Sequence, residues 1–165
     1  MNEQNTKKML TDFPALFRDA LRSSSEQQTC MGRGFECSDG WFQLIYELCT
    51  SIEAQAREMG LDPATEDWPM ARQVKEKFGS MRFYISTPSP EPSDNRLEAE
   101  SRGDLLSFRP VASIESIRKL VAEAEAKSST ICQGCGQPAE MRNDGGYWRV
   151  LCDPCEAKRI SERNL

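Results

Sequence analysis

Cys132-Gln-Gly-Cys135 and, after sixteen intervening residues, Cys152-Asp-Pro-Cys155 decide how the C-terminal part of this chain folds. Two Cys-x-x-Cys pairs at this separation are typical of a zinc site, with a β-hairpin between the pairs. The chain contains no histidine, so all four ligands would be thiolates, and such a site is closed and structural rather than catalytic. The alternatives are two disulfides, a redox-active Cys-x-x-Cys, or coincidence. The spacing predicts one structural Zn²⁺ held by Cys132, Cys135, Cys152 and Cys155.

The residues around these cysteines predict a small finger over residues 130–165. Residues 137–142 and 147–151 have the composition of strands, and Asn143-Asp-Gly-Gly146 between them is a strong turn sequence. A helix should follow the second cysteine pair, from residue 156 to about residue 162. A knuckle, a hairpin, a second knuckle and a helix, in this order, are typical of a zinc-ribbon or treble-clef finger.

Residues 1–86 predict a helix-hairpin domain. Residues 11–22 have a helical pattern with Asp12 as the N-cap, and residues 40–59 form the clearest helix, with Asp39 as N-cap and Gly60 as C-cap. Apolar side chains recur at helical spacing along the second helix. They are Trp41, Leu44, Ile45, Leu48, Cys49, Ile52, Ala56 and Met59.

Residues 72–86 predict a β-hairpin whose two-residue turn is Gly79-Ser80, of type II′. This register places Phe78 opposite Met81. One face then carries side chains that can pack on the long helix, and Glu76 falls on this face without explanation. The apolar members of the face are Val74, Phe78, Met81, Phe83 and Ile85.

The opposite face of the hairpin predicts an anion- or nucleotide-binding patch of Lys75, Lys77, Arg82 and Tyr84. In the expected register Lys77 faces Arg82, and two opposed cations destabilise a sheet unless acidic side chains, an anionic ligand or solvation offset them. The aromatic ring of Tyr84 beside the cations favours a phosphate or nucleotide ligand. The alternative is an ordinary solvated strand face.

Between the two domains, residues 87–110 are rich in Pro, Ser and acidic side chains, which predicts a loop or linker. Residues 111–129 predict a helix that packs back on the N-terminal domain. Its apolar stripe consists of Ile114, Ile117, Leu120, Val121 and Ala124. The expected fold class is α+β, with helices packed on a small antiparallel hairpin or sheet and a C-terminal finger.

The composition favours a protein that stays in the cytoplasm. The 165 residues contain no apolar run long enough for a membrane span, and the first residues lack the apolar stretch of a signal peptide. Outside the metal pattern Cys30, Cys37 and Cys49 remain, and this odd number favours reduced thiols over disulfides. A net charge of −5 argues against non-specific binding to nucleic acid.

The order of these motifs resembles a group of small phage and prophage proteins that combine a helix-hairpin domain with a C-terminal zinc finger. The resemblance spans roughly residues 31–160, and Val-Lys-Glu-Lys-Phe-Gly at residues 74–79 is its most distinctive part. The finger alone is also similar to that of the DksA/TraR transcription regulators. The resemblance implies a phage accessory protein in the cytoplasm of a bacterial host.

No catalytic constellation stands out, because a chain without histidine excludes the Ser-His-Asp and Cys-His arrangements. A reactive Cys37 beside Glu36 is the alternative in which the protein is an enzyme. We expect instead a non-enzymatic protein that binds and modulates a host or phage protein, in host transcription or anti-phage defence. The other expectation is binding of nucleic acid or a nucleotide through the basic-aromatic hairpin face.

Overall fold

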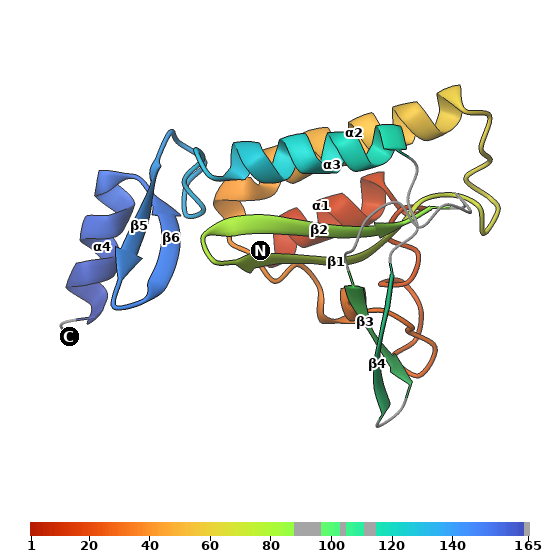
Figure 1. Cartoon of the computed structure of the whole chain (residues 1–165), viewed down its shortest axis with the longest axis horizontal. Coiled ribbons are helices and arrows are strands. Elements are labelled where there is room, and N and C mark those ends of the chain that lie inside the picture. Colours follow the sequence, from red (N-terminus) through yellow and green to blue (C-terminus); the bar gives the residue numbers. More distant parts are fainter. Residues whose placement is uncertain (88–96, 103–104, 111–114, 164–165) are drawn as a thin grey trace.

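The computed structural model describes residues 1–87, 97–102, 105–110 and 115–163. Within them the chain forms four α-helices and three two-stranded antiparallel sheets, which confirms the α+β class (Figure 1). The elements are α1 (Glu3–Asp12), the 3-10 turns η1 (Cys30–Arg33) and η2 (Asp39–Trp41), α2 (Phe42–Glu58), β1 (Met70–Lys77), β2 (Ser80–Ser86), β3 (Leu97–Arg102), β4 (Leu105–Pro110), α3 (Glu115–Ser128), β5 (Glu140–Asp144), β6 (Tyr147–Leu151) and α4 (Asp153–Arg163).

The first helix lies earlier in the chain than residues 11–22, so that prediction is wrong. Helix α1 begins after Asn2, whose side chain caps it, and ends at Asp12. Pro14 disfavours a helical backbone at the residue before it, and Phe13 accordingly leaves the helical region with φ −126° and ψ 53°. The chain continues in turns that still bring apolar side chains into the core. The buried ones are Phe13, Leu16 and Phe17.

Helix α2 confirms the long predicted helix, and Gly60 follows it with a left-handed φ of 76°. Asp39 is not its N-cap, because the 3-10 turn η2 separates Asp39 from the first helical residue. Its carboxylate instead accepts hydrogen bonds from the Asn2 backbone N–H at 2.8 Å and the Asn5 side-chain amide at 3.0 Å. Asp39 therefore joins the start of α1 to the start of α2.

The β1–β2 hairpin turns at Phe78-Gly79, one residue earlier than predicted. Both turn residues have positive φ, 54° and 75°, which is the type I′ geometry that suits the twist of a two-residue hairpin. Lys77 therefore pairs with Ser80 and Lys75 with Arg82. The pairing changes by two residues, so each strand side chain keeps its predicted face. Phe78 does not, because it lies at the turn and is 69% exposed.

Glu76, which the sequence left unexplained, stabilises this turn. Its carboxylate accepts a hydrogen bond of 2.6 Å from the backbone N–H of Gly79. The rest of this face packs inward as expected. Its buried residues are Val74, Met81, Phe83 and Ile85.

Neighbouring segments cover both edges of the β1–β2 sheet. At the β1 edge, the Glu36 backbone donates to the Val74 carbonyl and accepts from the Glu76 N–H, each at 2.9 Å. At the β2 edge, helix α3 packs on both α2 and β2 (Figure 1). There Ser128 Oγ accepts from Met81 N and Glu125 Oε1 accepts from Phe83 N, each at 2.9 Å. Side chains of α3 thus satisfy strand donors that would otherwise lack partners.

Part of the segment predicted as a loop or linker is a β-hairpin. Strands β3 and β4 pair antiparallel, from Leu97 opposite Pro110 to Arg102 opposite Leu105. The prediction for residues 88–96, and that of helical residues 111–114, lie outside the described residues. The proposed division of the chain into domains stays a prediction. In the part of the chain that the structure describes, no helix has the length and apolar composition to cross a membrane.

Candidate metal centre

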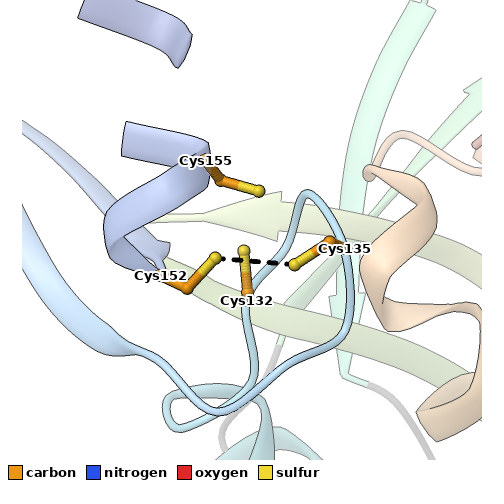
Figure 2. A group of neighbouring side chains, drawn as sticks. All are labelled: Cys132, Cys135, Cys152 and Cys155. Atoms are coloured by element: carbon orange, nitrogen blue, oxygen red, sulfur yellow. Dashed lines mark hydrogen bonds between the residues drawn. The ribbon is translucent and has the colours of Figure 1, made fainter. Parts of the chain in front are cut away.

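The four cysteines of the two Cys-x-x-Cys pairs point their sulfur atoms toward one centre (Figure 2). All four Sγ atoms lie within 4.8 Å of one another, and Cys135 and Cys152 are 3.5 Å apart. Four thiolates bound at about 2.3 Å around a tetrahedral ion would be about 3.8 Å apart. The sulfurs are free thiols rather than disulfides. This cluster could therefore hold one metal ion, and it is the one such group within the described residues.

Two tight turns supply the ligands. In the first, the Cys132 N–H donates to the Gln137 carbonyl at 2.7 Å, and Gly136, with φ 80°, donates to the Cys132 carbonyl at 2.8 Å. The second begins where β6 ends, and α4 carries Cys155 in its first turn. The β5–β6 hairpin between them turns at two glycines with positive φ and folds the second pair back onto the first.

Backbone donors prepare Cys132 for the thiolate form. Burial by itself raises its pKa, but the backbone N–H groups of Cys152, Cys135 and Gly134 aim at its sulfur and bring the pKa down to about 6. The Cys155 thiol has the opposite tendency, since hydrogen bonds with the Cys135 and Cys152 sulfurs, together with burial, raise its pKa to about 12. Neighbouring thiolates repel one another, so full ionisation of the four sulfurs needs a cation at their centre.

The first turn, which we call the knuckle (residues 131–136), is hydrogen-bonded directly to the N-terminal part of the chain. The Gly40 N–H donates to the Gln133 carbonyl at 3.0 Å, and the indole N–H of Trp41 donates to the Ile131 carbonyl at 2.9 Å. Trp41 is completely buried. A Cβ on Gly40 would lie 2.1 Å from the Cys132 carbonyl oxygen, so only glycine fits this contact.

Gly40 and Trp41 are site residues that the sequence did not reveal. The sequence pattern places both at the start of the predicted helix of residues 40–59, and nothing local marks them as partners of a turn some ninety residues later. The only signal is a glycine placed directly before a tryptophan at a helix start. The turn that carries Cys132 and Cys135 is therefore packed against the segment that leads into α2.

The predicted anion patch is partly neutralised. Lys75 lies opposite Arg82, and Arg82 is 3.7 Å from the carboxylate of Glu125 on α3. The Nζ of Lys75 lies 5.2 Å from the centre of the Tyr84 ring, a cation–π contact. Within the described residues, Lys75 and Lys77 are the two cations of the patch without a carboxylate within 4.0 Å. An acidic side chain thus offsets the opposed cations, and anion binding by the patch stays a prediction.

Two of the three remaining cysteines, Cys37 and Cys49, belong to the hydrophobic core. Cys37 and Cys49 are buried, and burial raises the pKa of the Cys37 thiol to about 11. A thiol with that pKa is protonated at neutral pH, which does not favour its use as a nucleophile.

Compared with known proteins, the chain matches no protein-family model, no curated protein and no solved structure.

Proposed function

We propose that Cys132, Cys135, Cys152 and Cys155 bind one zinc ion whose role is structural, in a finger of the zinc-ribbon or treble-clef type. Support comes from the all-thiolate ligand set, the sulfur spacing and the backbone donors aimed at Cys132. Four protein ligands complete the coordination of the ion. The zinc would therefore hold the knuckle in the shape that Gly40 and Trp41 contact, rather than act on a substrate.

We further propose that the protein is a non-enzymatic accessory protein of a phage, which binds and modulates a host or phage protein in the bacterial cytoplasm. The observation that carries this proposal is the attachment of the knuckle to Gly40 and Trp41. It fixes the finger against the rest of the chain, so that the two parts present one rigid surface. Host transcription and anti-phage defence are the processes in which we expect the partner.

An affinity experiment tests this function. Zinc-loaded, tagged full-length protein is mixed with lysate from phage-infected bacteria, and retained proteins are identified and re-tested after purification. We expect one purified host or phage protein to bind directly with a defined stoichiometry. If no retained protein binds after purification, the proposed function is wrong.

Recognition of nucleic acid or a nucleotide through Lys75, Lys77, Arg82 and Tyr84 is the second candidate. The cation–π contact of Lys75 with Tyr84 favours it, because proteins that bind single-stranded nucleic acids combine cations with aromatic rings. The pairing of Arg82 with Glu125 and the net charge of −5 weigh against it. Full retention of oligonucleotide or nucleotide binding by a folded Lys75→Glu/Lys77→Glu/Arg82→Glu variant would rule this candidate out.

A further inference from the structure

Three large apolar side chains are exposed where the β1–β2 turn meets the finger. Phe78 lies at the turn and is 69% exposed, while Met141 of β5 and Trp148 of β6 are 39% and 45% exposed. We call these three residues the junction surface. The other two tryptophans of the chain, Trp41 and Trp68, are almost completely buried. Trp148 is thus the exposed one of the three tryptophans.

The two hairpins touch at this place. A Cβ on Gly79 would lie 2.4 Å from Met141 Sδ, so the turn that carries Phe78 lies directly against β5. Met141 pairs with Val150 and Asn143 pairs with Trp148 in the β5–β6 ladder, so Met141 and Trp148 lie on the same face. Val150 on that face is completely buried. Met141 and Trp148 are therefore the exposed residues of a face whose Val150 is buried.

Phe78 occupies a position that does not suit it structurally. Its φ of 54° lies in the left-handed region, where a side chain other than Gly, Asn or Asp costs about 1–2 kcal/mol. Asn-Gly or Asp-Gly is the usual pair at a type I′ turn. A phenylalanine that is mostly exposed regains little of this cost through burial. Backbone strain of this kind is common at binding sites, where the side chain serves a ligand.

The charges beside the junction surface are positive and available. The Nζ of Lys77 lies 5.4 Å from the centre of the Phe78 ring, and Lys75 follows on the same face of β1. Most described lysines and arginines have a carboxylate within 4.0 Å, as in the pairs Lys8–Asp12 and Arg57–Glu53. Lys75 and Lys77 have none among the described residues. A ligand that complements this site would bring its own carboxylates.

We propose that the junction surface binds an extended or helical segment of a protein partner. The segment inserts an aromatic or leucine side chain among Phe78, Met141 and Trp148 and sets aspartate or glutamate side chains against Lys75 and Lys77. This inference rests on the proposed function of binding a protein. Aromatic residues and methionine dominate the energetic centres of protein interfaces, with charged residues at the rim. Two lysines would neutralise only about two phosphates, which favours this occupant over nucleic acid.

The site also requires the finger to be docked. Phe78 comes from one side of the contact, and Met141 and Trp148 come from the other. The knuckle connects the two sides through Gly40 and Trp41. Metal removal should therefore abolish binding at the junction surface even though every residue of the surface remains in the chain.

The test uses short random peptides displayed on a carrier and selected against zinc-loaded full-length protein. Selected peptides should combine an aromatic or leucine residue with neighbouring Asp or Glu. Phe78→Asn and Trp148→Ser should each weaken their binding at least about tenfold, or about 1.4 kcal/mol. Lys75→Glu/Lys77→Glu should weaken it similarly, and metal chelation should abolish it. Phe78→Asn suits the left-handed turn, so this loss would occur in a chain that folds at least as well as the wild type.

Two controls match these substitutions. Met59→Ser removes an apolar side chain that is 42% exposed. Met59 directly follows α2, and this end of the helix lies far from the finger (Figure 1). Lys7→Glu reverses an exposed lysine on α1. Neither should change peptide binding. Selected peptides without acidic residues, or peptides that bind Phe78→Asn and Trp148→Ser as tightly as the wild type, would overturn the inference.

The outcomes separate this inference from the proposed function. A purified cellular partner that binds Phe78→Asn and Trp148→Ser normally would leave the function standing and exclude the junction surface. Self-association lost in Trp148→Ser, with no peptide selected, would assign the surface to a second copy of the chain and overturn the inference. Absence of both peptide and partner binding to the wild type would reject both proposals.

Discussion

Replacement of Gly40 by alanine should separate the finger from the rest of the protein while leaving its four cysteines intact. A Cβ at this position would lie 2.1 Å from the Cys132 carbonyl oxygen and 2.7 Å from both the Gln133 carbonyl carbon and the Gly136 nitrogen. All three are main-chain atoms, so no side chain can rotate away to make room. The knuckle has to move.

The cost follows from the contacts that this movement breaks. Overpacking of a close contact costs about 1–3 kcal/mol. The displacement also weakens the Gly40–Gln133 and Trp41–Ile131 hydrogen bonds, each of which contributes about 1 kcal/mol. We therefore expect the free energy of unfolding to fall by about 2–4 kcal/mol.

Urea unfolding, zinc analysis and hydrogen exchange of the Trp41 indole N–H would test this prediction. In Gly40→Ala the indole should exchange much faster than in the wild type, while the protein keeps its full zinc content. Gly60→Ala is the matched control, because Gly60 has a φ of 76° and no atom within 4 Å of its virtual Cβ. That variant should lose about 1 kcal/mol to backbone strain with no change at Trp41. If Gly40→Ala kept the stability and the indole exchange rate of the wild type, the close contact at Gly40 would not attach the finger to the N-terminal part of the chain.

Glu125→Gln keeps an acceptor for the Phe83 N–H but removes the charge that pairs with Arg82. Glu125→Gln should change the free energy of unfolding by less than about 1 kcal/mol. It should also increase the affinity for a short single-stranded oligonucleotide at low salt, measured by fluorescence anisotropy. Unchanged affinity would contradict the neutralisation of Arg82 by Glu125. The Asn2 backbone N–H and the Asn5 amide lower the pKa of Asp39 in the folded protein. The Asp39 carboxylate therefore stabilises the fold at any pH above the pKa that it has in the unfolded chain. This contribution is lost as the pH falls through the lower pKa of the folded state. Asp39→Asn should therefore be less stable than the wild type at neutral pH and equal to it in acid, in urea unfolding as a function of pH; a pH-independent difference would contradict this. Cys155→Ser should lose zinc and unfold the finger, since structural zinc binding contributes about 10–16 kcal/mol in isolated fingers. Circular dichroism and metal analysis would check it, and a folded, zinc-loaded variant would contradict it.

Local signals explain what the sequence predicted well. The cysteine cluster follows from the spacing of four residues in the chain, and α2 follows from apolar side chains at helical spacing. Helix α1 has no stripe of apolar side chains at helical spacing, because Met9 is its one buried residue. The apolar residues that suggested a helix, such as Leu16 and Phe17, reach the core from turns instead.

The turn of the β1–β2 hairpin shows a different limit. Turns at Phe78-Gly79 and at Gly79-Ser80 differ by two residues in pairing, so both leave Val74 and Met81 on the buried face. The alternation of apolar and polar residues therefore cannot distinguish them. The choice depends on Glu76, whose carboxylate binds the Gly79 N–H, and on the left-handed backbone of Phe78.

Sequence patterns do not predict the contacts between distant segments. The hydrogen bond from Trp41 to Ile131 crosses 90 residues, and the contact between Gly79 and Met141 joins two separate hairpins. No local pattern encodes either one. These contacts attach the cysteine cluster to the N-terminal part of the chain and bring Phe78 next to Met141.

X-ray absorption at the zinc edge, combined with elemental analysis of freshly purified, reduced full-length protein, would show whether the four cysteines hold one zinc ion. We predict one zinc per chain with four sulfur neighbours at about 2.3 Å. Well under one zinc per chain, or a zinc with nitrogen or oxygen ligands in place of the sulfur of Cys132, Cys135, Cys152 or Cys155, would contradict it.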